Sequence, residues 1–451
     1  MKFGTDGLRG PAGTVIDGVV GWRVGHGLGK HVLQSCPPAS PLVGPGVLPA
    51  VVAVGRDTRP SGAALLQAVV AGARAAGVDV VDLGVLPTPA LASVVRGAGC
   101  AGGVMVTASH NLSADNGLKV LDRGGEKAGP ALRAALEAAL AEQRTPVLLG
   151  PRGALLAAPS LDVWDPCGGV DLSSLHIVLD AANGAAHELG RARLEAAGAR
   201  VTLLGDGDGR KINLGCGALH PAPLAEAVAR LGADVGIALD GDGDRLAMVV
   251  QPSDGAAQPA WLDGDAILWV LGHDLPVGGL IVGTVMSNLA LESGLSARGV
   301  RWVRTAVGDA EVWSAMQAEG ALLGGEPSGH LMFRGGVNDP VGSCGLATAA
   351  RVLALGLPTV RERLASWRPA TQRSGVVPRG SLPVELSSVE AIHARVAPAS
   401  ALLLAAGARV VVRPSGTEPI IRVMVEHADA ATAEDGCRQL ISLLRADTGC
   451  P

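Results

Sequence analysis

A serine, a histidine and a lysine follow a strongly apolar run in the stretch "VMVTASHNLSADNGLKV", residues 104–120. Ser109 and His110 are neighbours, and neighbouring residues of an extended chain point to opposite sides, so His110 is poorly placed to act as the base of a hydrolase. The flanks also lack the G-x-S-x-G pattern of a nucleophile elbow. The stretch is therefore a plain turn before Lys119, a weak hydrolase site, or a serine that carries a phosphoryl group covalently.

Three aspartates alternate with glycines in "ALDGDGDRLAMV". Alternation after a strand places Asp240, Asp242 and Asp244 on one side of an extended turn, where three anions repel unless a cation lies among them. Oxygen ligands in a tight loop favour Mg²⁺ over zinc. An EF-hand is excluded because Gln251 stands where its twelfth position needs a glutamate. The alternative is a solvated acidic turn.

Two further loops combine hydroxyl groups with charged side chains. "GGEPSGHLMF" sets Glu326, Ser328 and His330 among glycines, which suits sugar hydroxyls, although a single histidine is more often structural. "VVVRPSGTEPIIRVMVE", residues 410–426, places guanidinium groups, hydroxyls and turn amides between two predicted strands, as an anion cradle requires. The cradle residues are Arg413, Ser415, Gly416, Thr417 and Arg422. The alternative for this stretch is a charged hairpin turn.

One pattern recurs in the segments that must position these loops. "ARAAGVDVVDLG", "LEAAGARVTLLG" and "SARGVRWVRTAVG" each end a helix at a glycine and begin a β-branched strand. Their spacing of about a hundred residues predicts three tandem α/β modules. After "WRPATQRSGVVPRGSLP" the pattern becomes helix, strand, turn, strand and helix, which predicts a smaller α+β fourth domain. The elements expected there span 388–396, 409–413, 420–426 and 430–446.

The bulk composition agrees with a multidomain enzyme or binding protein. A chain of 451 residues is too long for one core. The net charge of -5 argues against a nucleic-acid partner. Seven cysteines without a C-x-x-C pair indicate reduced thiols, as in the cytoplasm, and "MKFGTDGLRG" lacks a signal-peptide core. Residues 32–55 are uncharged, but five prolines break any helix there, so we expect a loop and a strand rather than a membrane span.

The four loops, in this order, resemble the α-D-phosphohexomutase superfamily nearly from end to end, and within it the bacterial phosphoglucosamine mutases. The resemblance also rests on "FGTDGLRG", "GRDTRPSG" and "VGTVMSNLALE". It implies four domains with one loop from each meeting in a central cleft. The domain of residues 1–150 would carry a phosphoserine loop, 151–252 a metal site, 253–368 a sugar-binding loop and 369–451 a phosphate-binding loop.

The resemblance also implies a role for each candidate residue. Ser109 would be a phosphoserine, and one of its oxygens would join the three aspartates around Mg²⁺. Glu326 and Ser328 would bind the sugar, and the cradle residues would hold the phosphate that is not transferring. The negative charge that collects at such a site gives the nearby cations Arg9, Lys119 and Arg245 a purpose.

Two roles stay open at this stage. His110 is expected to support the serine loop, and either His330 or Lys119 could be the general acid and base.

The implied activity is the interconversion of glucosamine 6-phosphate and glucosamine 1-phosphate, with glucosamine 1,6-bisphosphate as intermediate and activator. It would feed UDP-N-acetylglucosamine and cell-wall synthesis. A phosphosugar would be the partner of a cytoplasmic monomer or homodimer, with no nucleic acid and no membrane. The alternatives are phosphomannomutase/phosphoglucomutase activity, a non-catalytic phosphosugar-binding protein, and a metal-dependent phosphatase. Family departures at Ala306, Ala310 and Glu326 lie near the expected sugar surface, so the reaction type is predicted more firmly than the sugar.

Overall fold

The computed structural model describes residues 2–4, 6–35, 50–142, 152–252, 259–335, 340–383, 386–415 and 419–445. Two of the cradle residues, Gly416 and Thr417, lie outside these ranges, as does most of the uncharged stretch. Within the ranges, no helix has both the length and the apolar character that crossing a lipid bilayer requires. The described cysteines are free thiols at positions 100, 167, 216, 344 and 437.

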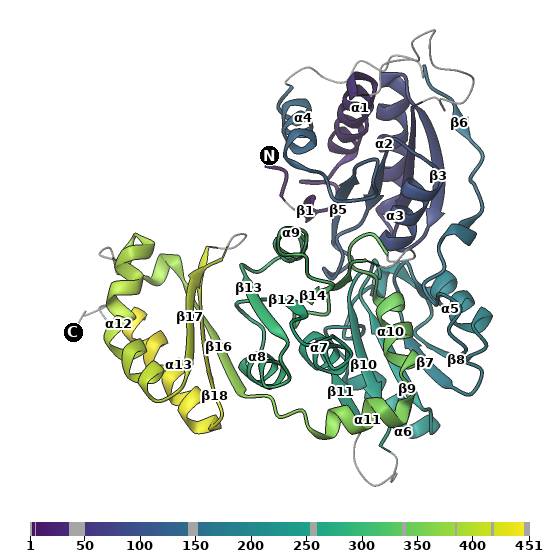
Figure 1. Cartoon of the computed structure of the whole chain (residues 1–451). Coiled ribbons are helices and arrows are strands. Elements are labelled where there is room, and N and C mark those ends of the chain that lie inside the picture. Colours follow the sequence, from purple (N-terminus) through teal and green to yellow (C-terminus); the bar gives the residue numbers. More distant parts are fainter. Residues whose placement is uncertain are drawn as a thin grey trace.

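Helices and strands alternate through three successive segments of the chain (Figure 1). The first contains β1 (Leu8–Pro11), α1 (Gly18–Ser35), β2 (Val51–Arg56), α2 (Gly62–Ala76), β3 (Asp79–Val85), α3 (Thr88–Gly97), β4 (Gly102–Val106), β5 (Asp115–Leu121), α4 (Pro130–Ala141) and β6 (Leu155–Leu156). The second contains β7 (His176–Asp180), α5 (His187–Ala196), β8 (Arg200–Leu204), α6 (Ala222–Leu231), β9 (Val235–Leu239), β10 (Leu246–Val250) and β11 (Ala260–Leu262). The third contains α7 (Gly264–Gly272), β12 (Leu280–Thr284), α8 (Leu289–Ser296), β13 (Arg301–Thr305), α9 (Asp309–Glu319), β14 (Leu323–Gly325), β15 (Leu331–Phe333), α10 (Gly345–Ala354) and α11 (Leu357–Ala365).

The three segments share one sheet topology. In each, the first core strand lies between the second and third, which run parallel to it, and a fourth strand returns antiparallel beside the third. The four strands are β2 to β5, β7 to β10, and β12 to β15. The expectation of three similar α/β modules is therefore confirmed.

The recurring glycines lie just after helices, as the sequence pattern predicted. Gly77 ends α2 with φ 108°, and Gly198 and Gly299 follow α5 and α8 with φ 95° and 77°. The left-handed conformation costs a residue with a Cβ atom about 1–2 kcal/mol in conformational energy, so glycine is favoured there. Each glycine turns the chain from the helix that follows the first core strand of a module into the second core strand.

The same connection carries the candidate chemistry in every module. The loop between the third and fourth core strands spans 107–114 in the first module, 240–245 in the second and 326–330 in the third. These loops touch one another. Arg245 and His330 form an isolated antiparallel bridge, and Ser109 bonds to Asp240. Three repeats of one hairpin thus build one site.

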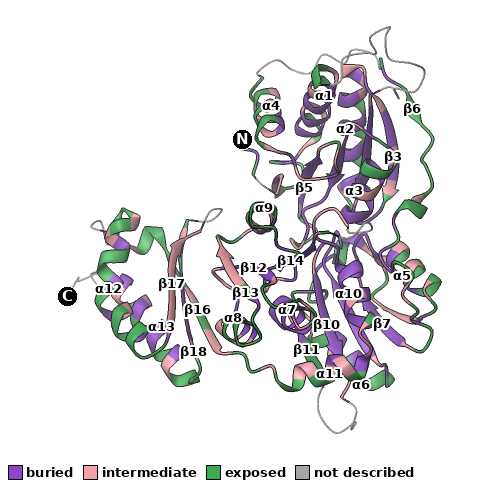
Figure 2. Ribbon diagram, in the orientation of Figure 1, coloured by how far each residue is buried: buried purple, intermediate pink, exposed green. Residues whose placement is uncertain are grey.

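A continuous apolar core joins these modules. One cluster of buried side chains includes Val81 of the first module, Leu239 of the second and Ile281 of the third. Strand β6 pairs with the first sheet just beyond residue 150, and β11 pairs with the second sheet just beyond residue 252. The central strands of the second sheet, β7, β9 and β10, are buried along their length, as is β4 of the first sheet (Figure 2). The shared core fixes the relative positions of the modules.

The C-terminal domain is smaller and has a core of its own. It contains β16 (Thr371–Pro378), α12 (Val389–Ala405), β17 (Arg409–Pro414), β18 (Ile420–His427) and α13 (Ala430–Arg445). The sheet order is β16-β18-β17, all antiparallel, so the expected α+β fourth domain is confirmed. Strand β16 was not predicted from the sequence, and α12 continues beyond the expected end near residue 396. Figure 1 shows this domain packed beside the third module and apart from the first.

Candidate active site

Ser109 is completely buried at the tip of the first hairpin loop. Its backbone adopts φ 51°, a left-handed conformation that costs a non-glycine residue about 1–2 kcal/mol. The backbone N–H of Ser109 donates to Thr107 Oγ1 over 2.9 Å, and its hydroxyl donates to Asp240 Oδ2 over 2.7 Å. The strained turn therefore aims the serine oxygen at the aspartate loop of the second module.

Arg59 holds the serine loop in this shape. Arg59 is 1% exposed, and its guanidinium donates to Asp57 Oδ2 over 2.9 Å and to the carbonyl oxygen of Ser109 over 3.0 Å. It also donates to the carbonyl oxygens of residues 111, 112 and 115. Asp57 in turn accepts from the Thr107 hydroxyl over 2.7 Å. The sequence marked this segment as part of the resemblance but gave Arg59 no role.

Asn213 secures the same loop from the second module. Its side-chain amide donates to the carbonyl oxygens of Ser109 and Asn111 over 2.8 and 2.9 Å. Asn213 is buried and itself has φ 58°. No sequence pattern distinguished it, because its partners are backbone oxygens far away along the chain.

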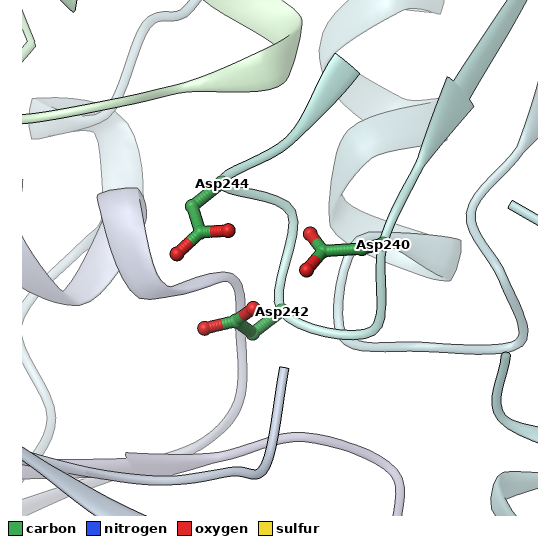
Figure 3. Close-up of side chains that lie close together, drawn as sticks. All are labelled: Asp240, Asp242 and Asp244. Carbon is green, nitrogen blue, oxygen red and sulfur yellow. The ribbon is translucent and has the colours of Figure 1, made fainter. Parts of the chain in front are cut away.

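The three aspartates converge as the alternating pattern predicted (Figure 3). Asp240, Asp242 and Asp244 are all at most 3% exposed, and one oxygen of each lies within 4.8 Å of the others. Burial, together with the Asp244 and Asp242 carboxylates, raises the pKa of Asp240 to about 7. Asp242 Oδ1 is buried without a hydrogen-bond partner. A crowded set of oxygen ligands with one orphaned acceptor fits a divalent cation.

Lys119 lies against the trio. Its ammonium donates to Asp242 Oδ2 and Asp244 Oδ2, each over 2.6 Å, and is 2% exposed. Against the effect of burial, these two aspartates hold the pKa of Lys119 well above its usual value. A lysine that stays charged offsets part of the negative charge here and is a weak proton acceptor.

His330 joins the third module to the aspartates. Its Nδ1 lies 3.0 Å from Glu326 Oε2 and its Nε2 lies 3.2 Å from Asp244 Oδ1. Burial opposes the charged form, but Asp244 raises the pKa of His330 to about 10. Arg245 Nε lies 3.3 Å from the same Nε2 atom, and Glu326 also accepts from the backbone N–H of Gly308 over 3.0 Å. The glutamate thus fixes the orientation of the imidazole ring.

A second group of charges connects the first and third modules. Asp6 binds both Arg9 and Lys127, and Lys127 also donates to Asp309 Oδ2 over 2.5 Å. Lys119 lies 4.0 Å from Asp6, so this group is continuous with the aspartate site. The predicted role of Arg9 as a nearby cation is thus consistent with its position, whereas the part played by Lys127 and Asp309 was not predicted.

His110 and Ser328 lie in the same hairpin loops but make fewer contacts. Burial, with Arg245 and Arg9, lowers the pKa of His110 to about 3, and its buried Nδ1 has no hydrogen-bond partner. A neutral imidazole is compatible with a supporting role. Ser328 is half-buried at the tip of the third loop.

The described residues of the predicted anion cradle lie on the C-terminal domain. Arg413 and Arg422 are cross-strand partners of β17 and β18, and Ser415 follows β17. Burial and then Arg422 lower the pKa of Arg413, whose buried Nε has no hydrogen-bond partner. Both arginines and Met286 of the third module line a cavity of about 310 Å³. Two like charges beside an orphaned donor suit an anion.

Comparison with known proteins identifies the fold as that of a phosphohexomutase. Four family models match: the phosphoglucomutase/phosphomannomutase alpha/beta/alpha domains I, II and III at residues 1–146, 169–254 and 263–368, and the C-terminal domain at 377–443. The chain belongs to the phosphoglucomutase/phosphomannomutase family.

Its curated relatives include several named phosphoglucosamine mutase. One from Frankia alni is 39% identical over 464 residues, which cover 100% of this chain and 99% of the relative. One from Pelotomaculum thermopropionicum is 36% identical over 470 residues, 99% of each. A solved phosphoglucomutase/phosphomannomutase family protein from Burkholderia thailandensis shares the fold with a TM-score of 0.75 at 24% identity, covering 98% of this chain and 96% of that one.

Proposed function

We propose that this chain interconverts glucosamine 6-phosphate and glucosamine 1-phosphate. The activity class follows from the family, and the sugar is the one named for relatives that match along their full length. The observation that carries the mechanism is the 2.7 Å hydrogen bond between the buried Ser109 hydroxyl and Asp240. It places a potential phosphoryl carrier at the edge of a carboxylate trio.

In the proposed cycle, phospho-Ser109 donates its phosphoryl group to the 1-hydroxyl of glucosamine 6-phosphate. The bond from phosphorus to the serine oxygen breaks, and a bond to the sugar oxygen forms. Glucosamine 1,6-bisphosphate results and turns within the cleft. The 6-phosphoryl then returns to Ser109 and leaves glucosamine 1-phosphate, so the same bisphosphate supplied from outside would activate unphosphorylated protein.

Mg²⁺ is the ion that we propose for the aspartate site. Asp240, Asp242, Asp244 and an oxygen on Ser109 would hold it, and when bound it would offset the charge on the transferring phosphoryl oxygens. The residues of the chain itself would supply the remaining positive charge, since Lys119 and Arg245 pair with the trio and Arg9 pairs with Asp6 beside Lys119.

His330 is the residue that we propose for proton exchange with the sugar hydroxyl. Lys119 is less suited because Asp242 and Asp244 hold its pKa well above the usual value. His330 is anchored through Nδ1 by Glu326, and its Nε2 reaches the aspartates. An imidazole that leaves Asp244 for a substrate hydroxyl loses the main cause of its raised pKa and can then accept a proton.

The third hairpin loop and the C-terminal domain supply the remaining binding roles in this proposal. We propose that Glu326 and Ser328 contact the sugar, and that Arg413, Ser415, Gly416, Thr417 and Arg422 grip the phosphate that is not transferring. The division at residues 150, 252 and 368 belongs to the same proposal, although β6 and β11 lie just beyond the first two boundaries and pair with the sheet of the preceding module. We expect the protein to act in the cytoplasm on free phosphosugars, as a monomer or homodimer.

The decisive experiment compares wild-type protein with Ser109→Ala in a coupled mutase assay that contains Mg²⁺ and a trace of bisphosphate. Wild type should convert the glucosamine substrate and show a partly phosphorylated species in an intact-mass spectrum. Ser109→Ala should lack both. A wild-type protein that never gains the phosphoryl mass, even with bisphosphate, contradicts the mechanism.

The same assay with glucose 1-phosphate and mannose 1-phosphate tests the sugar. The second candidate, phosphomannomutase/phosphoglucomutase activity, is favoured by the names of the family models. Faster turnover of either neutral sugar than of the glucosamine substrate would replace our assignment by that one.

A further inference from the structure

A cavity of about 370 Å³ lies between the first and third modules. The first module lines it with the start of α3 and the segment between β5 and α4, and the third module lines it with α9, β15 and the residues before α10. Figure 1 shows α9 between the first module and the third sheet. Of the described residues assigned to the proposed cycle, Asp244 alone reaches this cavity. A space of this size holds a small organic ligand, and we call it the intermodule cavity.

Part of the wall of the intermodule cavity is apolar. Ala92 and Leu121 of the first module and Met332 of the third border the cavity, and each is at most 2% exposed. Helix α9 adds Ala310 and Trp313. Ala310 is one of the positions at which the chain departs from its family, and it contributes only a methyl group to the wall. Such a wall favours an apolar ligand group, because their contact removes both surfaces from water.

Four polar groups at the wall have no partner in the described part of the chain. The side chains of Glu126, Glu311 and Arg133 make no hydrogen bond or ion pair with a described residue. The indole N–H of Trp313 is buried and also lacks an acceptor. Glu126 precedes α4, Arg133 lies near the start of that helix, and Glu311 lies in the first turn of α9. A buried donor without an acceptor is costly, so this part of the cavity favours a ligand that accepts a hydrogen bond.

The remaining charges at the wall are already paired. Lys127 donates to Asp309 Oδ2 over 2.5 Å, and Asp244 accepts from Lys119 over 2.6 Å. The unsatisfied groups are therefore one guanidinium, one indole donor and two carboxylates beside an apolar surface. A ligand with a single charge leaves the opposite group unpaired, whereas a ligand with an anion, a cation and an apolar body satisfies both signs.

We propose that the intermodule cavity binds a free α-amino acid with an apolar side chain. The carboxylate of the amino acid accepts from Arg133 and from the indole N–H of Trp313. Its ammonium group pairs with Glu126 or Glu311, and its side chain packs on the apolar wall. Because the wall comes from two modules, the bound amino acid joins the first module to the third. The site does not depend on the proposed mutase activity, so an inactive protein would still test it.

Isothermal titration calorimetry of the full chain tests the ligand class with matched probes. L-leucine and L-phenylalanine carry all three groups, leucinamide lacks the carboxylate, and N-acetyl-L-leucine lacks the ammonium group. We expect at least one of the two amino acids to bind with a Kd below about 1 mM, and the two derivatives to bind at least about tenfold more weakly than L-leucine. Absence of binding by both amino acids at about 10 mM, or equal binding of either derivative and L-leucine, would overturn the proposal.

Two sets of charge variants assign the polar contacts. Arg133→Met should weaken the binding of L-leucine at least about tenfold and leave that of leucinamide unchanged, because leucinamide has no carboxylate to lose a partner. The double variant Glu126→Gln with Glu311→Gln should weaken L-leucine to a similar degree and leave N-acetyl-L-leucine unchanged. The control is Arg230→Met, which removes an exposed arginine of α6 that does not line the cavity. Binding by Arg133→Met that equals binding by Arg230→Met would contradict the proposal.

Filling the cavity tests its location. Ala310→Trp places a large ring in the space beside the methyl group and should abolish binding of L-leucine. Ala318→Trp is the matched control, because residue 318 is exposed on the same helix and does not line the cavity. If Ala310→Trp melts at a lower temperature than this control, Ala310→Leu provides a smaller filling group and should weaken binding at least about tenfold. Binding of L-leucine to a folded Ala310 variant with the wild-type Kd would refute the site.

A competition titration separates the intermodule cavity from the catalytic cleft. Glucosamine 6-phosphate also carries an ammonium group and an anion, but it has no apolar body. The Kd of L-leucine should stay within about threefold of its original value when glucosamine 6-phosphate is present at saturation. Displacement of L-leucine by the sugar phosphate would place both ligands in one site and overturn the proposal.

Discussion

The aspartate trio should make the stability of the protein depend on pH in a way that Mg²⁺ reverses. Burial and the neighbouring carboxylates raise the pKa of Asp240 to about 7, from an ordinary 3.8. The folded state therefore favours the neutral form of Asp240. The stability that Asp240 contributes is fully present below about pH 4, falls as the pH rises and is lost once the pH has passed through 7. The pKa difference of about three units corresponds to a change of roughly 4 kcal/mol at most in the free energy of unfolding.

A divalent cation bound to the trio would remove this loss, because it would stabilise the ionised carboxylates. We expect Mg²⁺ to raise the unfolding temperature of metal-stripped protein by several degrees at pH 8 and much less at pH 5, where Asp240 is neutral. Asp240→Asn should be more stable than wild type at pH 8 without Mg²⁺ and should respond little to the ion. Differential scanning calorimetry at pH 5, 6.5 and 8, with and without Mg²⁺, measures these differences.

Asp265 provides the control. Burial and then Asp263 raise the pKa of Asp265 to about 8, and it accepts from the backbone N–H of Asn288 over 2.7 Å, in the third module. Asp265→Asn should alter the pH dependence of stability and leave the Mg²⁺ response intact. Equal Mg²⁺ effects at pH 5 and pH 8, or a full response in Asp240→Asn, would refute the assignment of the ion to the trio.

Three further variants test the surroundings of the trio. Arg59→Lys should lower the free energy of unfolding by about 3–5 kcal/mol in urea titrations, because buried carbonyls and Asp57 lose their partner, and intact-mass spectra should show less phospho-Ser109. Lys127→Met should lower the free energy of unfolding by about 1–2 kcal/mol in the same titration, since Asp6 and Asp309 lose their shared ammonium partner. An unchanged free energy would mean that the ion pairs of Lys127 are screened by solvent. His330→Asn should lower kcat at least a hundredfold while Ser109 still becomes phosphorylated, and a decrease under tenfold would place proton transfer elsewhere.

The parts of the site that sequence patterns could predict are those whose partners are close in the chain. Alternating aspartates must converge in an extended turn, and helix-ending glycines must precede strands, so both features were visible. Arg59 and Asn213 were not predicted, because they donate to backbone oxygens of the serine loop that lie 50 or more residues away in the chain. A backbone acceptor leaves no mark on the sequence that would reveal its donor.

In the C-terminal domain the sequence did not predict strand β16 and predicted too early an end for helix α12, and both errors have the same cause. Strand β16 contains Gly375 and ends at Pro378, which are both unfavourable in isolated strands, but it pairs along its whole length with β18. Helix α12 continues through Pro398, where local preference ends a helix. Burial of Val396, Ala399 and Leu403 in the domain core outweighs that preference. Long-range packing decided both cases.

The repetition of one hairpin in three modules has a consequence for how this protein can fail. In the mechanism that we propose, each copy supplies a different group: one the serine hydroxyl, one the acidic ligands and one the imidazole. None can substitute for another, in spite of the shared architecture. A fragment that lacks any one repeat should therefore be inert rather than weakly active, and mixing two complementary fragments should restore turnover only when they reassociate.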